Sequence, residues 1–588
     1  MRGPPLEVLM LCLVLLLWVQ IVLHPIVYSS YSYEFVLLLD YVFVVAEGSH
    51  YDYTAYTECK SQPEAPLYGG GILTRNSEDT QLAYHKTETG VYSPAFVLYN
   101  LTETTKYSFS CWVKIKGTKS AVLKARLSTD ITTLTCIGTS LARSGCWSFL
   151  KGGFVLDSSS RTSVIYFQVF FLFSSCHTLV CQSDNQNATI ISVKSASLQP
   201  FSAEQWNLQQ ENSIHLNRKR SVTVHVSDTR GSRITGANVS VFQLSKNFPF
   251  GSAISKTILG NKTYQAWFRE RFNAAVFENE LKWYATEPKP GILNYSIPDE
   301  MLEFIRANQI MARGHNIFWE DPRYTPSWVR NLTGDDLRAA VNSRIDSLLT
   351  RYKGDFAHWD VSNEMLHFDF YEERLGTNAS LVFFNTAQRS DPLATLFMND
   401  FNVVESCDDV NSNVDSYASR LKELKEGGGM LEGIGLEGHF SKPNIPLMRA
   451  VLDKLATLEL PIWLTEVDIS KNFDQQTQAK YLEEVLREGF SHPFVNGIMI
   501  WSALDANGCY QMCLTDGDFH NLPAGDVVDR LLQEWNTKEL GVTDDHGSYS
   551  FNGFLGEYKV FIGYPNISME TTFSLDRGIE TKQINIQI

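Results

Sequence analysis

Eight apolar runs alternate with segments of helical spacing between Phe248 and Trp501. They recur at intervals of roughly 25 to 45 residues and begin near residues 248, 272, 314, 357, 394, 433, 461 and 495. Such alternation indicates a parallel sheet whose strands are joined by crossover helices. Eight strand–helix units in roughly 290 residues predict a (β/α)8 barrel. The alternative is a doubly wound sheet, which would place a glycine-rich phosphate loop after its first strand, and this sequence has none there.

The regions on either side of the barrel alternate with the period of strands. Residues 59–205 contain short runs rich in valine, serine, threonine and aromatic residues, and they predict an all-β sandwich. Residues 215–244 and 541–588 are predicted to be β segments that flank a barrel of residues 245–536. We expect these two segments to pack together as one small sandwich.

The N-terminus has the pattern of an export signal. Arg2 precedes an uncharged apolar run from Val8 to Val27, so residues 1–50 are predicted to be a signal sequence. An uncleaved membrane anchor is the alternative, and only in that case would the protein bind a membrane. Eight Asn-x-Ser/Thr sequons support export and glycosylation. They are Asn100, Asn187, Asn238, Asn261, Asn294, Asn331, Asn378 and Asn566.

Charge and cysteine content exclude several classes of function. With 50 basic and 66 acidic residues, the formal charge is −16, which argues against nucleic acid as a partner. Ten cysteines are too few for a disulfide framework at this length, and none has paired zinc-ligand spacing. Cys509 and Cys513 could bridge each other or be independent thiols. No cofactor and no metal are expected.

Residues 169–182 interrupt the predicted sandwich. They are apolar and unpatterned, and they separate a strand-like run at 163–168 from a polar stretch at 183–187. The segment opens with valine and closes with glutamine, as a translated intron would. We therefore interpret it as a retained intron, which sequencing of the mature transcript would test.

Polar side chains gather at the predicted carboxyl ends of the barrel strands, where the chemistry of such barrels lies. An unpaired buried polar group costs about 1–3 kcal/mol, so this concentration indicates a functional site. The set is Glu278, Asn279, Lys282, His315, Trp319, Glu320, Asn363, Glu364, Glu437, His439, Glu466, Asp468 and Trp501.

Glu364 and Glu466 would face each other across the barrel mouth, an arrangement that suits glycoside hydrolysis. One carboxyl must be protonated to donate to the leaving oxygen, and the other must stay ionised to attack the anomeric carbon. Amide, amine and imidazole groups nearby can bind sugar hydroxyls, and two indoles can stack on sugar rings. A metal site is less well supported, because His315 and His439 would need a third partner.

Five ordered motifs, at 272–283, 313–319, 359–364, 433–440 and 464–468, resemble glycoside hydrolase family 10, the endo-β-1,4-xylanases. The resemblance covers roughly 245–535 and implies retaining double displacement on xylan or xylo-oligosaccharides. It implies that Glu364 is the acid/base and Glu466 the nucleophile. It places Glu278, Asn279, Lys282, His315, Trp319, Asn363 and Trp501 in the substrate cleft, and it makes His439, Asp468 and Glu437 neighbours of the nucleophile. We expect a monomer secreted to the cell wall.

The sequence departs from the family pattern at three places in the barrel. Glu320 stands where many members have histidine, and we expect it to add negative charge beside the −1 sugar site. Glu437 stands where many have glutamine, and it could raise the pKa of a neighbour. Residues 505–513, with Tyr510, replace a second tryptophan platform.

The β region before the barrel is similar to a family 22 carbohydrate-binding module. The likeness rests on residues 144–148, 151–153 and 197–201. Two other functions stay open for the whole chain. One is a non-catalytic xylan-binding wall protein, and the other is a xylan transglycosylase that uses the same covalent intermediate.

Overall fold

The predicted barrel is present and closed in the computed structural model. The structure describes residues 50–73, 80–82, 85–87, 90–130, 135–170 and 190–588. The barrel strands are β12 (Phe250–Ile254), β13 (Ala274–Phe277), β14 (Met311–Gly314), β15 (Phe318–Trp319), β16 (His358–Asn363), β17 (Thr395–Asp400), β18 (Gly433–Phe440), β19 (Ile462–Ile469) and β20 (Val495–Ile500). All pair in parallel, and β12 contacts both β13 and β20, which closes the sheet.

The third barrel strand is divided, whereas the sequence predicts one continuous run at 314–319. β14 and β15 both pair with β16, and residues 315–317 between them leave the ladder. A side chain at Gly314 would collide with the indole of Trp359, because its β-carbon would lie 2.2 Å from a ring atom. Because β14 ends at Gly314, His315 lies outside the strand, at the carboxyl end of the barrel.

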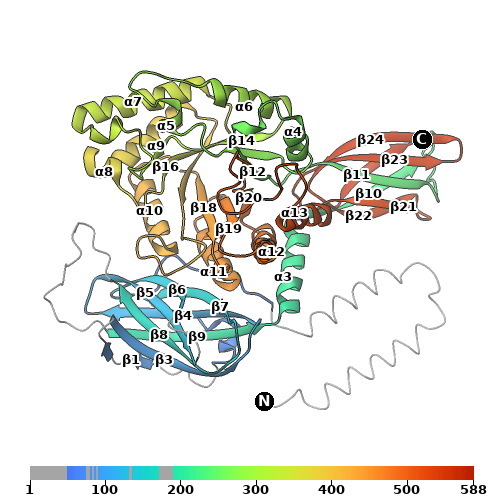
Figure 1. Cartoon of the computed structure of the whole chain (residues 1–588). Coiled ribbons are helices and arrows are strands. Elements are labelled where there is room, and N and C mark those ends of the chain that lie inside the picture. Colours follow the sequence, from blue (N-terminus) through green and yellow to red (C-terminus); the bar gives the residue numbers. More distant parts are fainter. Residues whose placement is uncertain (1–49, 74–79, 83–84, 88–89, 131–134, 171–189) are drawn as a thin grey trace, which may run out of the picture. The chain divides into compact units, whose positions relative to one another are not determined.

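Helices lie around the outside of the barrel strands (Figure 1). They are η2 (Lys256–Ile258), α4 (Lys262–Arg269), α5 (Trp283–Thr286), α6 (Ser296–Ala307), η3 (Val329–Asn331), α7 (Gly334–Arg351), α8 (Phe370–Leu375), α9 (Ala379–Ser390), α10 (Val414–Glu426), α11 (Ile445–Ala456), α12 (Gln475–Ser491) and α13 (Pro523–Glu534). Side-chain caps begin several of them, as at Asn413 and Asp474, whose oxygens accept backbone N–H groups of the first turn.

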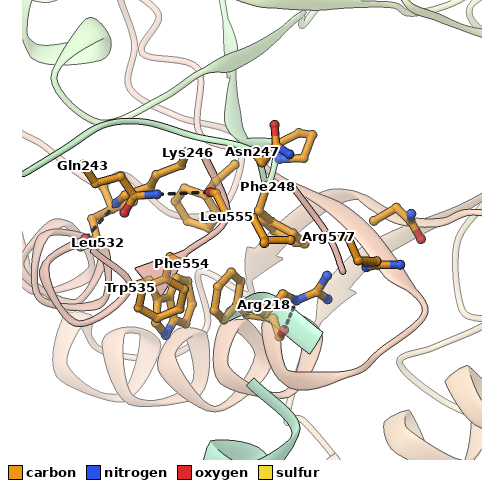
Figure 2. A pocket seen from close by; sticks show the side chains of 14 residues that line it. Arg218, Gln243, Lys246, Asn247, Phe248, Leu532, Trp535, Phe554, Leu555 and Arg577 are labelled. Atoms are coloured by element: carbon orange, nitrogen blue, oxygen red, sulfur yellow. Dashed lines mark hydrogen bonds between the residues drawn. The ribbon is translucent and has the colours of Figure 1, made fainter. Parts of the chain in front are cut away.

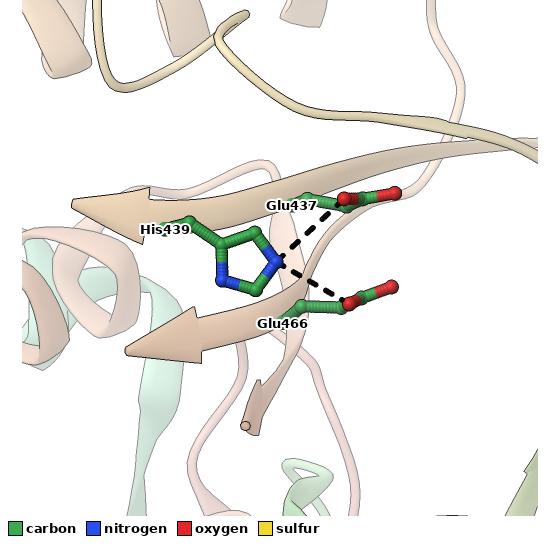
Figure 3. Close-up of side chains that lie close together, drawn as sticks. All are labelled: Glu437, His439 and Glu466. Carbon is green, nitrogen blue, oxygen red and sulfur yellow. Dashed lines mark ion pairs between the residues drawn. The ribbon is translucent and has the colours of Figure 1, made fainter. Parts of the chain in front are cut away.

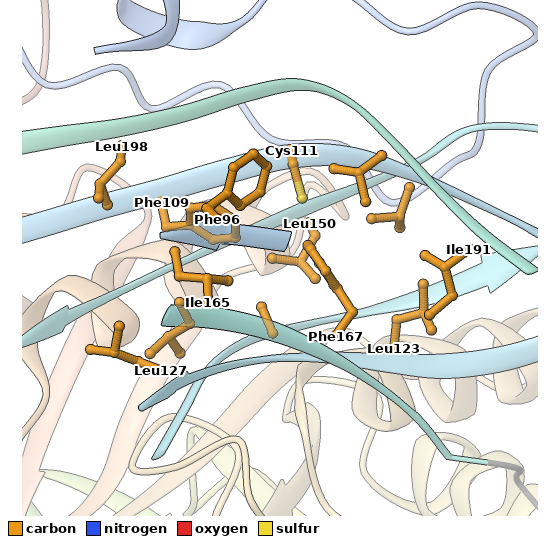
Figure 4. Packing of buried hydrophobic residues seen from close by; sticks show 14 of the residues in the cluster. Phe96, Phe109, Cys111, Leu123, Leu127, Leu150, Ile165, Phe167, Ile191 and Leu198 are labelled. Atoms are coloured by element: carbon orange, nitrogen blue, oxygen red, sulfur yellow. The ribbon is translucent and has the colours of Figure 1, made fainter. Parts of the chain in front are cut away.

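The N-terminal region is all-β, as predicted. After η1 (Leu67–Gly70) come β1 (Thr80–Leu82), β2 (His85–Thr87), β3 (Gly90–Leu101), β4 (Lys106–Lys116), β5 (Ser120–Thr129), β6 (Thr135–Arg143), β7 (Ser148–Val155), β8 (Ser160–Phe170) and β9 (Ile190–Phe201). They form one antiparallel sheet in the order β1-β9-β4-β7-β6-β5-β8-β3-β2. Phe96, Phe109, Ile165 and Phe167 lie in one buried core between the strands (Figure 4). The family 22 likeness of this region stays a prediction.

The N-terminal region packs against barrel helices α10 and α11. A disulfide joins Cys136 on β6 to Cys407 in the loop after β17. Lys151 on β7 pairs with Asp453 on α11 at 2.6 Å, and both side chains are fully buried. The backbones also approach closely, since a β-carbon at Gly153 would lie 2.5 Å from Pro446. The all-β region is therefore part of the folded unit rather than a loosely tethered module.

Helix α3 (Ala203–Arg218) follows the all-β region, where no helix was expected. Its buried face is largely polar, so hydrophobic periodicity does not reveal it. The indole of Trp206 and the amide of Gln210 both donate to Glu488 at 2.9 Å. The capping box formed by Ser202 and Gln205 is the local signal for its start.

The β segments on both flanks of the barrel form one small sandwich, as expected. Its strands are β10 (Lys219–Ser227), β11 (Asn238–Lys246), β21 (Lys538–Val542), β22 (Ser548–Phe554), β23 (Gly556–Tyr564), β24 (Ile567–Leu575) and β25 (Lys582–Gln587). One sheet has the order β22-β10-β25 and the other β21-β11-β23-β24. The chain before the barrel thus pairs with the chain after it around a shared apolar core.

A cavity of about 220 Å³ lies where α3, α12 and α13 meet this sandwich and the start of β12 (Figure 2). Phe248, Trp535 and Phe554 form its aromatic walls, and the guanidinium group of Arg218 lies 4.6 Å from the centre of the Phe248 ring. The cavity is at the amino end of the strands, opposite the end where the polar residues gather.

Two predictions fall outside the described residues. The signal sequence or anchor lies in 1–49, and most of the intron-like segment 169–182 lies in 171–189. Both stay predictions. Among the helices that the structure describes, none combines the length and the apolar character needed to cross a bilayer.

The buried Lys151–Asp453 pair gives a test of the interface between the all-β region and the barrel. Lys151→Met removes the ammonium group from the buried Asp453 carboxylate, which keeps its contact with His492, and we expect a loss of about 3 kcal/mol in the free energy of unfolding, measured by urea denaturation. Lys422→Met is the matched control, because its partner Glu58 is also in the N-terminal region but this pair is exposed. The control should change stability by less than about 1 kcal/mol. Equal stability of Lys151→Met and the unmodified protein would contradict the role of this pair.

Candidate functional site

A cleft of about 420 Å³ opens at the carboxyl ends of the barrel strands. It is lined by Glu278, Asn279, Lys282, Tyr284, His315, Trp319, Asp321, Arg323, Tyr324, Asn363, Glu364, Phe368, Phe401, Glu437, His439, Glu466, Trp501 and Tyr510. Both predicted catalytic carboxylates and all seven predicted substrate-binding residues are among them. Of the three predicted supporting residues, two line the cleft, and Asp468 lies behind it, where it accepts a hydrogen bond from His439.

The pairing of β18 with β19 sets the arrangement around Glu466. The parallel register places Glu437 beside Glu466 and His439 beside Asp468. Residues two apart in a strand face the same side. The Nε2 atom of His439 therefore lies between the two glutamates, 3.4 Å from Oε2 of Glu466 and 3.7 Å from Oε2 of Glu437 (Figure 3).

Glu466 stays ionised although it is buried. Burial by itself raises a carboxyl pKa, but positive charge on His315, the hydrogen bond and charge of His439, and Lys282 outweigh it and lower the pKa of Glu466 below its usual value. Nδ1 of His315 lies 3.8 Å from Oε1 of Glu466.

Each histidine beside Glu466 has a buried aspartate behind it. His315 Nδ1 lies 3.0 Å from Asp360, and His439 Nδ1 lies 3.0 Å from Asp468. Burial opposes the positive charge on His439, but Asp468 and Glu466 outweigh it and raise the pKa of the imidazole well above its usual value. Asp468 and Glu466 thus keep His439 cationic.

Asn399 on β17 connects the two sides of the cleft, a role that sequence reasoning did not assign. Its Nδ2 lies within 3.1 Å of oxygens of Asn363, Glu437 and Glu466, so its two hydrogens are shared among three acceptors. Its Oδ1 accepts from the hydroxyl of Thr465 at 2.5 Å. The only signal in the sequence is its place at a strand end.

Glu364 has the opposite electrostatic environment to Glu466. It follows β16 with φ 60°, a left-handed conformation that few residues other than glycine adopt, and its N–H donates to the carbonyl of Asn399. Burial raises the pKa of Glu364 to about 8, and the charges of Asp400 and Glu466 act in the same direction. Glu364 is therefore protonated at neutral pH.

Glu437 is a buried carboxyl that the strand register places beside Glu466. Burial, together with the charges of Glu466 and Glu364, raises the pKa of Glu437 well above its usual value. Repulsion between Glu437 and Glu466 is thus resolved by protonation of Glu437. A protonated Glu437 is neutral, as a glutamine at this position would be.

Glu320 does not add charge to the cleft, and the expectation that it lies beside the −1 sugar site is wrong. Its side chain is completely buried and accepts hydrogen bonds from the Ser362 hydroxyl and the Tyr371 N–H. Adjacent residues of a strand point to opposite faces, so Trp319 lines the cleft and Glu320 points away from it.

Aromatic and polar groups form the walls of the cleft. The amine of Lys282 lies 4.5 Å from the centre of the Trp319 ring and donates to Asn279. Tyr324 stacks on Trp319, with 3.9 Å between the ring centres. Tyr510 lies against His439 on the opposite side, in a loop closed by a disulfide between Cys509 and Cys513.

Several cleft residues were not predicted. They are Tyr284, Asp321, Arg323, Tyr324 and Phe368. Three of them follow Trp319 directly in a loop, where no periodicity marks a functional residue. His367 was not predicted either, and it does not line the cleft, but its ring nitrogens lie 2.6 Å from Asp400 and 3.0 Å from Asp409.

Comparison with known proteins agrees with this geometry. The glycosyl hydrolase family 10 model matches residues 241–524. Endo-1,4-beta-xylanase 5 of Arabidopsis thaliana is 35% identical over 535 residues, which is 88% of this chain and 91% of that protein. Endo-1,4-beta-xylanase 5-like of the same plant is 35% identical over 90% of this chain and 92% of that protein. A crystal structure of xylanase 10B from Thermotoga petrophila with xylobiose covers 49% of this chain and 94% of that one, at 23% identity and a TM-score of 0.44. Because the plant relatives match over nearly their whole length, this chain belongs to glycosyl hydrolase family 10.

Proposed function

We propose that this protein is a retaining endo-1,4-β-xylanase that cleaves internal β-1,4 bonds of xylan. One observation carries the proposal. Two buried carboxyls line the same cleft, and their surroundings move their pKa values in opposite directions. Double displacement needs one protonated and one ionised carboxyl at the same pH.

In the first step Glu364 donates its proton to the glycosidic oxygen while Glu466 attacks the anomeric carbon. The leaving chain departs, and the remaining sugar is bound covalently to Glu466. Glu364, now ionised, takes a proton from water, and that water attacks the anomeric carbon and releases Glu466. Asn363 and Lys282 line the cleft beside these carboxyls, where they can bind sugar hydroxyls.

Xylan as substrate is supported by the names of the plant relatives and by the cleft motifs shared with the family. The expectation of a polysaccharide rather than a nucleic acid also agrees with the net charge of −16. The aromatic rings of Trp319 and Trp501 offer apolar faces for sugar rings.

We also propose secretion to the cell wall, which three disulfides among the described residues support. They are Cys59–Cys146, Cys136–Cys407 and Cys509–Cys513. Disulfides persist in oxidising compartments such as the extracellular space. Of the seven sequon asparagines that the structure describes, all but Asn261 are exposed, so glycans can be attached to them without unfolding.

The first test measures reducing ends released from xylan by the full chain. We expect Glu364→Gln to lower kcat by about 10²- to 10⁴-fold, because the proton donor is lost. Glu466→Gln should lower kcat still further, because no covalent intermediate can form. Glu373→Gln is the matched control on an exposed glutamate outside the cleft, and its activity should equal that of the unmodified protein.

The same experiment separates the alternatives. Binding of xylan without release of reducing ends would show a non-catalytic binding protein instead. Products longer than the starting oligosaccharide would show transglycosylation. Proton NMR of fresh products gives the stereochemistry, and initial formation of the α-anomer would contradict retention.

The pH profile gives a further prediction. Catalysis needs protonated Glu364, so kcat/KM should fall as the pH rises through the pKa of this residue, at about 8. Catalysis also needs ionised Glu466, so kcat/KM should fall only at pH values below the ordinary glutamate range. The measurement is kcat/KM on a soluble xylo-oligosaccharide, with Glu373→Gln as control. An alkaline limb near pH 5 would contradict the assigned environment of Glu364.

A further inference from the structure

Glu437, His439 and Glu466 form a group with the spacing of metal ligands. One ligand atom from each of the three residues can be chosen so that all three atoms lie within 4.8 Å of one another (Figure 3). Nε2 of His439 is 3.4 Å from Oε2 of Glu466 and 3.7 Å from Oε2 of Glu437. Ligands at about 2.0–2.1 Å from a tetrahedral zinc ion are about 3.3 Å apart. The two distances from the histidine nitrogen therefore come within a few tenths of an ångström of this spacing.

Asp468 and Asn399 orient the side chains of Glu437, His439 and Glu466. Asp468 lies 3.0 Å from Nδ1 of His439, which leaves Nε2 facing the glutamates. Asn399 donates to Oε1 of both glutamates, which leaves both Oε2 atoms toward His439. A carboxylate behind a ligating histidine is the usual outer contact of zinc sites.

We propose that Glu437, His439 and Glu466 bind a zinc ion at the mouth of the cleft, and that binding releases to solvent the proton of the Glu437 carboxyl and the proton on Nε2 of His439. Three protein ligands leave the fourth tetrahedral position open, and it faces the cleft because all three residues line it. One imidazole and two carboxylates suit Zn²⁺, whereas Mg²⁺ prefers octahedral oxygen ligands and retains its water. Glu437 makes this site particular to the chain, since a glutamine at 437 would offer only a neutral amide oxygen.

Zinc in this site competes with the substrate. The ion takes Oε2 of Glu466, so this oxygen can no longer reach an anomeric carbon. This consequence rests on the proposed function of Glu466 as nucleophile, whereas the binding of zinc does not. Zinc should therefore act as a competitive inhibitor, with its affinity set by Glu437.

The test is calorimetric titration of the full chain with zinc chloride. We expect a site whose affinity falls by more than about tenfold in Glu437→Gln, and by about 10- to 100-fold in Asp468→Asn. Glu320→Gln is the matched control, because Glu320 is equally buried but does not line the cleft, and it should bind zinc like the unmodified protein. Magnesium chloride should give no binding that depends on Glu437. If Glu437→Gln does not fold, as judged by its thermal melt, Asp468→Asn decides the outcome.

Xylo-oligosaccharide distinguishes failure of this proposal from failure of the proposed function. Saturating oligosaccharide should abolish zinc binding at the site, and zinc should raise KM for xylan with kcat unchanged. Zinc binding that depends on Glu437 in a protein that does not cleave xylan would support the metal site and overturn the proposed function. Xylan cleavage with no zinc binding at about 1 mM, or with equal affinity in the folded variants, would overturn the metal site.

Discussion

The ionised state of Glu466 inside the barrel is the constraint on which the rest of the site depends. Burial of a carboxylate is costly unless positive charge and hydrogen-bond donors surround it. Those groups come from four other strand ends: Lys282, His315, Asn399 and His439. None is near Glu466 in the chain, so the groups that stabilise its charge in the buried site surround it only when the barrel is closed. Asp360 and Asp468 lie behind His315 and His439, so each histidine stands between a buried aspartate and Glu466.

Closure of the barrel also determines the state of Glu364, which is protonated where Glu466 is ionised. This carboxyl lies in the same cleft, but burial and neighbouring carboxylates raise its pKa. Glu437 shows the same effect beside Glu466, because its proton removes a repulsion that two charges would create. Three glutamates in one cleft thus have different protonation states, and the difference comes from what surrounds each one.

The N-terminal β region is joined to the barrel by a disulfide and a buried ion pair, unlike a module attached only by a linker. The loop after β17 carries Cys407, which is bonded to β6, and Asp409, which contacts His367. His367 in turn contacts Asp400, whose charge raises the pKa of Glu364. The contacts from the β region therefore continue to the residues behind the acid/base, and experiments on the barrel should keep this region.

Much of the fold and of the site could be predicted from the chain. Apolar runs at regular intervals indicated the barrel, and polar residues at the ends of those runs indicated the cleft. Helix α3 was not predicted, because its buried face is made of Trp206, Gln210, Ser213 and Arg218 rather than an apolar stripe. The Cys136–Cys407 bond was not predicted either, since it joins residues 271 positions apart in two regions of different fold.

By itself the sequence determined which side chains stand at the strand ends, because strand periodicity and motif order are local properties of the chain. Only the tertiary structure decided the direction in which each side chain points and its protonation state. Glu320 was expected beside the reacting sugar but faces away from the cleft, whereas Glu437 was expected near the nucleophile and does lie beside Glu466. A pKa depends on burial and on charges that are close in space, and these distances exist only after the chain has folded.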